Sequence, residues 1–226
     1  MLTKLSRLQL NDNALAGSIP RELGFLADME EMWLSFNQLS SSIPTDLGLL
    51  TKLSMLYLHE NALVGSIPTE IGFLSDMEDF WLASNELSSN IPTELGLLTK
   101  LSTLTLEDNT LTGSIPTELG LLTNMEDMAL DSNQLSSNIP TELGLLTKLS
   151  LLHLNDNALA GSIPTELGFL SGMEDMQLHI NQLSSNIPTE LGLLTKLSWL
   201  ILNDNAPVSY THLRAHETKA NLVCRL

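Results

Sequence analysis

Histidine and acidic side chains are the groups of this chain that could transfer protons. His59, His153 and His179 fall in different segments, with no serine or cysteine nucleophile in a recognisable setting beside them. The Glu-Asp pairs recur in register, which indicates duplication of a unit and not a single acid–base dyad. Residues 1–206 contain no glycine-rich phosphate loop and no zinc-ligand spacing. The sequence therefore predicts that the chain is not an enzyme and that it binds no cofactor.

The acidic residues could also bind cations. Pairs of them recur at a constant step along the chain, with single acidic residues between: Glu30-Glu31, Glu78-Asp79, Glu126-Asp127 and Glu174-Asp175, then Asp12, Glu60, Asp108, Asp156 and Asp204. Stacked carboxylates could attract a basic peptide or Ca²⁺, and the alternative is a solvated face copied by duplication. The net charge of −17 argues against nucleic acid and against a basic membrane-binding patch, because both require clustered Lys and Arg.

A 24-residue period positions all of these groups. One asparagine recurs at that step: Asn13, Asn37, Asn61, Asn85, Asn109, Asn133, Asn157, Asn181 and Asn205. Ile-Pro pairs such as Ile115-Pro116 keep the same step. Nine asparagines in register cannot be explained as isolated turns. The chain is therefore expected to be a stack of similar coils that share one core.

Within one unit, alternation at Leu104 and Leu106 predicts a short strand with both side chains pointing inward. Asn109 falls at the following bend, where its amide can bond backbone groups that the turn leaves unpaired. Pro116 ends the extended segment and can open a short helical turn. Gly120 is expected to let the chain turn back toward the next strand.

The outward positions of these strands bring three aromatic residues into register. Trp33, Tyr57 and Trp81 follow one another at the same 24-residue step, and Phe36, Met55 and His59 lie beside them in the sequence pattern. We predict that these six residues form the partner-binding patch, because large exposed aromatics are typical of binding hot spots. Cross-strand aromatic pairing that only stabilises the sheet is the alternative.

The pattern L-x-x-L-x-L-x-x-N-x-L-x-G-x-I-P-x-x-L-G-x-L, which covers residues 2–205, resembles the plant-type leucine-rich repeat of receptor-like kinase ectodomains and polygalacturonase-inhibiting proteins. The resemblance implies an α/β, right-handed solenoid with a parallel concave sheet, a second short strand per coil and 3-10 turns on the convex side. It also implies a protein, peptide or glycan ligand and an extracellular or cell-surface location. A membrane anchor or kinase domain would lie elsewhere in the full-length protein.

The repeats depart from that pattern in alternate units, where serine replaces glycine at Ser41, Ser89, Ser137 and Ser185. Thr3-Lys4-Leu5 also recurs in every second unit, so residues 1–206 are predicted to be nine repeats organised as a 48-residue double repeat that is incomplete at both ends. A further series is expected to stabilise the start of each helical turn, with a flat ice-binding array as its remote alternative: Thr45, Thr69, Thr93, Thr117, Thr141, Thr165 and Thr189.

After Ala206 the period stops, and Pro207-Val208-Ser209-Tyr210-Thr211-His212 begins a different segment. This segment resembles the translation of a transposase-based sequencing adaptor, so we interpret residues 207–226 as a non-native, adaptor-derived tail. A C-terminal capping helix is the alternative. His212 and His216, with Cys224 nearby, imitate a zinc site, and we predict no metal there.

The sequence thus favours a recognition module from a receptor-like or secreted protein. The alternative is a structural or adhesive array with a Ca²⁺-binding or ice-binding surface. No apolar run approaches the roughly 18 residues of a membrane-spanning helix, and the first residues lack the apolar core of a signal peptide.

Overall fold

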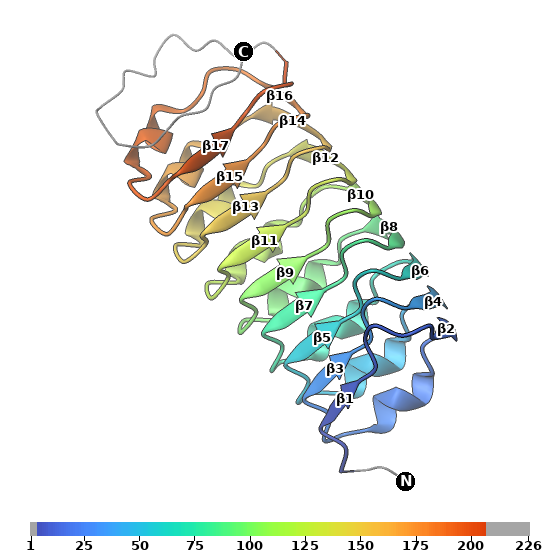
Figure 1. The fold of residues 1–226 in the computed structure, drawn as a ribbon. Helices are drawn as coiled ribbons and strands as arrows, with labels where there is room; N and C mark the ends of the chain where they lie inside the picture. The colour runs from blue at the N-terminus through green and yellow to red at the C-terminus, as the bar shows by residue number, and fades with distance from the viewer. Residues whose placement is uncertain (1–3, 207–226) are drawn as a thin grey trace.

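The computed structural model describes residues 4–206, which form coils stacked side by side along one axis (Figure 1). Each coil contributes one strand to a nine-stranded parallel sheet, and the strands pair in chain order. Successive partners keep the 24-residue spacing of the sequence, as where Met128 pairs with Leu104 and Leu152. The strands are β1 (Arg7–Gln9), β3 (Glu31–Trp33), β5 (Met55–Tyr57), β7 (Asp79–Trp81), β9 (Thr103–Thr105), β11 (Asp127–Ala129), β13 (Leu151–His153), β15 (Asp175–Gln177) and β17 (Trp199–Ile201).

A second parallel sheet of eight strands follows the first around each coil, as the resemblance implied. Its strands are β2 (Ala16–Gly17), β4 (Gln38–Ser41), β6 (Ala62–Gly65), β8 (Glu86–Asn90), β10 (Thr110–Gly113), β12 (Gln134–Asn138), β14 (Ala158–Ser162) and β16 (Gln182–Ser184).

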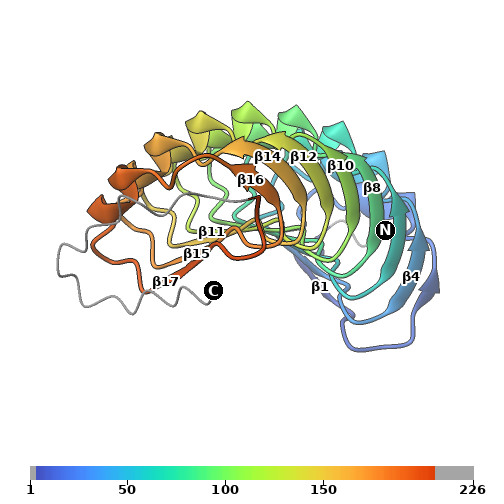
Figure 2. The same cartoon turned by 90° about the horizontal axis from the view of Figure 1, so that it is seen from above.

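Short 3-10 turns complete the coils on the convex side (Figure 2). They are η1 (Arg21–Phe25), η2 (Thr45–Leu49), η3 (Thr69–Phe73), η4 (Thr93–Leu97), η5 (Thr117–Leu121), η6 (Thr141–Leu145), η7 (Thr165–Phe169) and η8 (Thr189–Leu193). A proline with extended backbone precedes each turn, such as Pro116 at φ −64° and ψ 136°, because its fixed φ suits the entry to a helical turn. The predicted α/β leucine-rich-repeat solenoid is confirmed.

A single apolar core runs through all coils. Leu104 and Leu106 are fully buried, as are the other apolar positions of the same unit, Leu111, Leu119 and Leu122, and Ile115 is 2% exposed. Burial of one such side chain stabilises the fold by about 1.5–3 kcal/mol. One coil alone has no interior, so this stabilisation exists only where coils stack.

Asparagine side chains join neighbouring coils at the bend after each strand of the first sheet. Asn109 donates through Nδ2 to the carbonyl oxygens of Leu106 and Glu107 in its own coil and of Leu82 in the preceding coil. Its Oδ1 accepts from the backbone N–H of Leu87, also in the preceding coil. The same pattern recurs at Asn37, Asn61, Asn85, Asn133, Asn157, Asn181 and Asn205.

Glycines in the 3-10 turns have a different role from the one expected of Gly120. Gly120 does not adopt a positive φ, so its freedom to turn is not what the coil uses. A Cβ at this position would lie 2.6 Å from both the carbonyl oxygen and the Cβ of Glu142 in the next coil. Glycine is required here because the turns of neighbouring coils approach so closely.

Positive φ occurs instead at the end of each second-sheet strand. Gly113 has φ +78°, and Ser89 and Ser137 in alternate coils have φ +73° and +72°. The serines of alternate coils therefore keep the left-handed backbone conformation of the glycines they replace. This strains the backbone, because a residue with a Cβ atom disfavours the left-handed region. Within residues 4–206, no helix is both long and apolar enough to cross a membrane.

Candidate functional site

The exposed face of the nine-stranded sheet is the concave surface of the solenoid. The middle outward position of each coil forms one continuous column in constant register: Gln9, Trp33, Tyr57, Trp81, Thr105, Ala129, His153, Gln177 and Ile201. The column is aromatic in β3, β5 and β7 and mostly polar beyond. Recognition chemistry on this face therefore changes along the axis.

Trp33, Tyr57 and Trp81 form an aromatic ladder across three adjacent strands. The ring centroids of Trp33 and Tyr57 are 5.3 Å apart at an interplanar angle of 32°, and those of Tyr57 and Trp81 are 5.1 Å apart at 41°. All three side chains are partly buried, so one face of the ladder remains open to solvent. Tilted rings at this distance attract one another beyond simple area burial.

The other predicted patch residues surround the ladder. His59 stacks near Trp81 with centroids 5.3 Å apart, and Phe36 meets His59 edge-on at 5.1 Å. Met55 pairs in register with Glu31 and Asp79 at the start of the strands. Burial lowers the pKa of His59, which keeps its imidazole neutral near pH 7.

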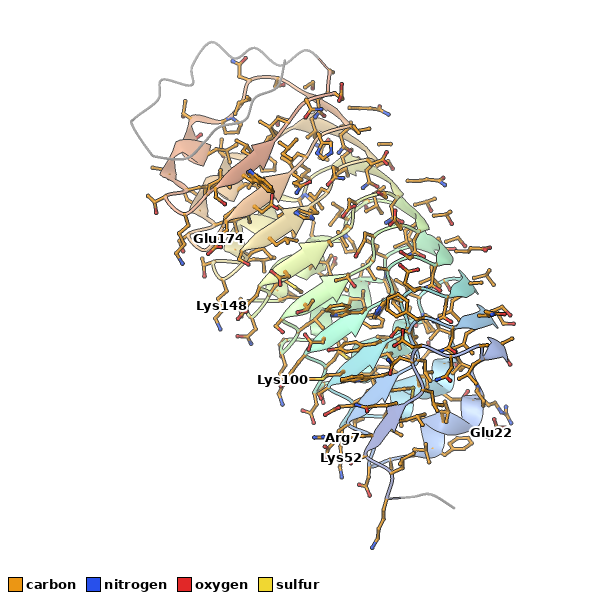
Figure 3. The ribbon with its side chains drawn as sticks, viewed as in Figure 1. Arg7, Glu22, Lys52, Lys100, Lys148 and Glu174 are labelled. Atoms are coloured by element: carbon orange, nitrogen blue, oxygen red, sulfur yellow. The ribbon has the colours of Figure 1, made fainter. Side chains whose placement is uncertain are left out.

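The charged groups beside the ladder have local partners. The hydroxyl of Tyr57 donates to the Asp79 carboxylate at 3.4 Å. Burial and the Asp79 charge raise the pKa of Tyr57 to about 12, so the phenol stays neutral. Arg7, seen at the end of the sheet in Figure 3, forms an ion pair with Glu31 at 3.1 Å.

Several polar atoms under the ladder have no partner. The Nε1 atoms of Trp33 and Trp81 and the Nδ1 atom of His59 are buried and unbonded within the described residues. An unsatisfied buried donor costs about 1–3 kcal/mol. Packing and not hydrogen bonding therefore holds the two tryptophans of the ladder in place.

A polar cluster that the patch prediction missed occupies the next coils. Glu107 and Asp131, here called the carboxylate pair, follow β9 and β11 in adjacent coils, where the N–H of Asp108 donates to the carbonyl of Asp131 at 3.2 Å. Burial raises the pKa of Glu107 to about 6 and also raises the pKa of Asp131. The regular spacing of these two residues was visible in the sequence, but their burial was not.

Further along, His153 and Gln177 both contact one carboxylate. His153 Nε2 lies 3.0 Å from Asp175 Oδ2, and Gln177 Nε2 lies 3.1 Å from the same atom. Asp175 therefore already has partners within the chain.

The repeated acidic residues of the sequence do not form one cluster. Each pair lies at the start of a first-sheet strand, where the carbonyl of Glu30 accepts from Ser54, whereas Asp12, Glu60 and their counterparts occupy left-handed positions beyond the strand ends. Across residues 4–206, no three His, Cys, Asp or Glu side chains lie close enough to hold a metal ion. The Ca²⁺ alternative therefore has no preformed site in this part of the chain.

A row of residues just before the strands of the first sheet, here called the sheet edge, alternates lysine with aspartate from Asp28 to Lys100 and then continues with Asn124 and Lys148. Lys52 Nζ lies 2.6 Å from Asp28 Oδ1, and Lys100 Nζ lies 2.6 Å from Asp76 Oδ1. Lys148 donates to Asn124 at 2.8 Å in the equivalent place. Figure 3 shows Lys52, Lys100 and Lys148 in a row along this edge, while Glu22 lies on the other side of the coils.

A second surface, the hydroxyl strip, runs along the outer side between the second sheet and the 3-10 turns. A shallow groove of about 770 Å³ there is lined by Ser42, Ile43, Thr45, Ser66, Ile67, Pro68, Thr69, Glu70, Ser89, Asn90, Pro92 and Thr112. Thr45 and Thr69 of the threonine series line this groove, and in six turns the threonine hydroxyl donates to the carboxylate of the next glutamate, as from Thr117 to Glu118 at 3.2 Å.

The remaining predicted features lie outside the described residues. They are His212, His216 and Cys224, together with the whole 207–226 segment that was interpreted as a tail.

A family model described as Leucine Rich Repeat matches residues 28–50 and 100–122. Comparison with curated protein sequences gives no match. Among solved structures, the leucine-rich-repeat ectodomain of the Arabidopsis thaliana membrane receptor kinase GASSHO1/SCHENGEN3, in complex with CASPARIAN STRIP INTEGRITY FACTOR 2, is similar with 36% identity and a TM-score of 0.89. The similarity covers 91% of the present chain and 24% of that chain.

Two further structures extend the comparison. The Arabidopsis receptor kinase HAESA, in complex with the peptide hormone IDA and the co-receptor SERK1, is 34% identical with a TM-score of 0.86, over 90% of the present chain and 34% of its own. A plant ice-binding protein is 27% identical with a TM-score of 0.80, over 92% and 66% of the two chains. The present chain thus spans about a quarter to a third of the two receptor structures. The repeat match, the coil geometry and these similarities show that the chain is a leucine-rich-repeat protein whose fold is similar to that of plant receptor-kinase ectodomains.

Proposed function

We propose that the concave face of the nine-stranded sheet binds a peptide, protein or glycan ligand, with the aromatic ladder at the centre of the contact. The observation that carries this proposal is the alignment of Trp33, Tyr57 and Trp81 in adjacent strands, with centroids 5.1–5.3 Å apart. A continuous aromatic surface on a solvent-facing sheet offers a large apolar contact area at low conformational cost. Similar structures with peptide ligands support the peptide class.

We place this recognition module in a receptor-like or secreted protein that works outside the cell or at its surface. The similarity to ectodomains of membrane receptor kinases supports this location. A larger protein that carries the module would supply any membrane anchor or kinase domain.

Selection of ligands from a displayed library of random hexapeptides tests the proposal. Peptides captured by the immobilised chain should lose at least tenfold in affinity when Trp33 and Trp81 are both replaced by alanine, because loss of a central aromatic removes about 1.5 kcal/mol or more. Trp199→Ala is the matched control, since Trp199 is 56% exposed at the far end of the sheet. Intrinsic fluorescence in a Trp199→Phe background reports on the ladder directly.

A fall in melting temperature without a fall in capture would mean that the ladder only stabilises the sheet. Failure of the wild-type chain to select any peptide, or any oligosaccharide on a glycan array, would reject a role of the concave face in binding peptides or glycans.

A second candidate function is adsorption to ice through the hydroxyl strip. Two observations favour it: small uncharged side chains dominate the groove of a strongly acidic chain, and a plant ice-binding protein has a similar fold. Charged groups bind water in orientations of their own, so an uncharged and regularly spaced surface suits ordered water better.

Inhibition of ice recrystallisation tests this second function. Thr45→Lys with Thr69→Lys should abolish the inhibition, because two ammonium groups would lie in the groove. Thr51→Lys with Thr99→Lys makes the same chemical change at exposed positions away from the strip and should have no effect. Absence of inhibition by the wild-type chain would exclude ice binding.

A further inference from the structure

Nearly all the charged side chains on the concave face are negative. Within the nine strands and the three residues that follow each of them, Arg7 is the only lysine or arginine. The same segments contain eleven carboxylates: Asp12, Glu31, Glu60, Asp79, Glu107, Asp108, Asp127, Asp131, Asp156, Asp175 and Asp204. A ligand that covers this face must therefore supply positive charge or leave carboxylates desolvated.

The carboxylates at the first position of β3, β7, β11 and β15 already have a partner. Glu31 pairs with Arg7, Asp79 accepts from Tyr57, and Asp127 accepts from Ser150 at 3.0 Å. The carboxylate pair is different. No Lys, Arg or His side chain of residues 4–206 lies within ion-pair distance of Glu107 or Asp131. His153 is near enough for its charge to lower the pKa of both carboxyl groups.

Within residues 4–206, Glu107 has a carboxylate oxygen that lacks a hydrogen-bond partner as well as a cationic one. Its Oε2 atom is buried and has no hydrogen-bond partner among the described residues. From other side chains, Asp131 accepts only a long hydrogen bond of 3.4 Å, which the hydroxyl of Ser132 donates. Two like charges on adjacent coils repel each other, and a cation between them would relieve the repulsion.

The carboxylate pair is continuous with the aromatic ladder. Trp81 pairs in register with Thr105, and Glu107 follows Thr105 by two residues in the next coil. From the coil of Trp33 to the coil of Asp131 there are four steps of about 4.8 Å, or roughly 19 Å. An extended peptide covers that length with about five or six residues.

We propose that the occupant of the concave face is a short, extended cationic peptide lying along the solenoid axis. An arginine or lysine of this peptide binds between Glu107 and Asp131, and an apolar or planar side chain nearer its other end stacks on the aromatic ladder. This inference rests on the proposed recognition role and adds the chemical class of the ligand. Arginine suits the site best, because its planar group can donate to both carboxylates at once.

Residue enrichment in the hexapeptide selection tests the class. Peptides selected on the wild-type chain should be enriched in Arg or Lys a few positions from an aromatic or aliphatic residue. Selection on the double variant Glu107→Gln/Asp131→Asn should lose the basic enrichment and keep the apolar one. The matched control, Glu118→Gln/Glu142→Gln, removes the same charge from adjacent coils on the convex side and should keep both.

Measurement of one selected peptide makes the test quantitative. Replacing its arginine by citrulline, which is neutral and nearly isosteric, should weaken binding about tenfold to a hundredfold on the wild-type chain. The same replacement should change binding by less than about twofold on the double variant, since no pair of charges remains to be lost. Binding of the arginine peptide should also weaken with rising salt.

The possible failures are distinct. Selected peptides that depend on Trp33 and Trp81 but carry no basic residue would overturn the cationic class and leave the recognition role intact. Ladder-dependent capture of an uncharged oligosaccharide alone would do the same. If nothing binds the concave face at all, both proposals fall.

Discussion

The side-chain oxygen of Asn109 lies 2.9 Å from the backbone nitrogen of Leu87, so one amide joins adjacent coils through two residues that are 22 apart in sequence. Its Nδ2 atom donates hydrogen bonds to three carbonyl oxygens, and one of these also belongs to the preceding coil. Asn109 is only 8% exposed, which leaves little access for water to replace these bonds. Each such asparagine therefore contributes to the interface between coils as well as to its own turn.

Asn109→Ala should lower the free energy of unfolding by about 3 kcal/mol, because it leaves a buried N–H and buried carbonyl groups unpaired. Urea unfolding measures the change. Asn13→Ala is the control: the Asn13 side chain is exposed and donates only to the carbonyl oxygens of Leu10 and Asn11 in its own coil, so its loss should cost less than about 1 kcal/mol. Equal effects at the two positions would contradict a role between coils.

Gly120→Ala should destabilise the chain by about 1–3 kcal/mol, because the new methyl group overlaps the backbone of Glu142. Gly192 occupies the equivalent place in the last described turn, where a methyl group would meet no heavy atom of residues 4–206 within 4 Å. Gly192→Ala should therefore leave the melting temperature unchanged or slightly higher. If both alanines proved harmless, close approach of the turns would not be the reason for glycine.

Ile180→Asn should stabilise the chain by about 1 kcal/mol. Ile180 has φ +51°, a left-handed conformation that a β-branched side chain tolerates poorly, and it is 45% exposed. Asn is among the residues that accept this conformation. The equivalent change at Asp156, where φ is +52°, should shift the thermal midpoint very little, since Asp already suits the site.

The stability of the wild-type chain should gain a pH dependence from Glu107. Its pKa is raised from 4.5 to about 6 in the folded chain, so the folded state holds a proton more tightly than the unfolded state. The protonated Glu107 therefore stabilises the folded state below about pH 4.5, and this contribution to the free energy of unfolding is lost as the pH rises from about 4.5 through 6. Because the group is not fully buried, the effect should be about 1 kcal/mol after allowance for solvent screening.

Chemical denaturation at pH 4.5, 5.5 and 7 gives this dependence as the difference between the wild-type chain and Glu107→Gln. The variant should be the more stable protein at pH 7, and the two should converge at low pH. A difference that grew on acidification would reverse the assigned direction of the pKa shift.

The fold was predictable because its cause is local and repeated. The alternation at Leu104 and Leu106 predicts a strand with an inward face, and Pro116 ends the extended segment. The constant repeat length then sets the register in which neighbouring strands pair. The purpose of Gly120 was not predictable in the same way. Its reason lies in Glu142 of the next coil, at a distance that only the stacked geometry defines.

The sequence predicted where the aromatic residues of the candidate site lie, but it did not predict the environment of the carboxylates beside them. Equal spacing is enough to align Trp33, Tyr57 and Trp81 once the strand direction is known. The environment of Glu107 and Asp131 depends on how deeply the sheet buries the two side chains and on which neighbours lack a counter-charge. Those quantities arise from contacts between coils, so the pattern of one repeat does not contain them.

The alternation of lysine and aspartate along one sheet edge limits how the array can change length. Excision of the single coil that carries Asp76 would remove the ion pair of Lys100 with Asp76 and bring Lys52 beside Lys100, so that a repulsive contact replaces an attractive one. Excision of the two coils that carry Lys52 and Asp76 would instead place Lys100 beside Asp28, an aspartate like the one it pairs with now. Gene rearrangements that add or remove coils should therefore be tolerated best when they move an even number of coils at a time, because the edge repeats itself only after two.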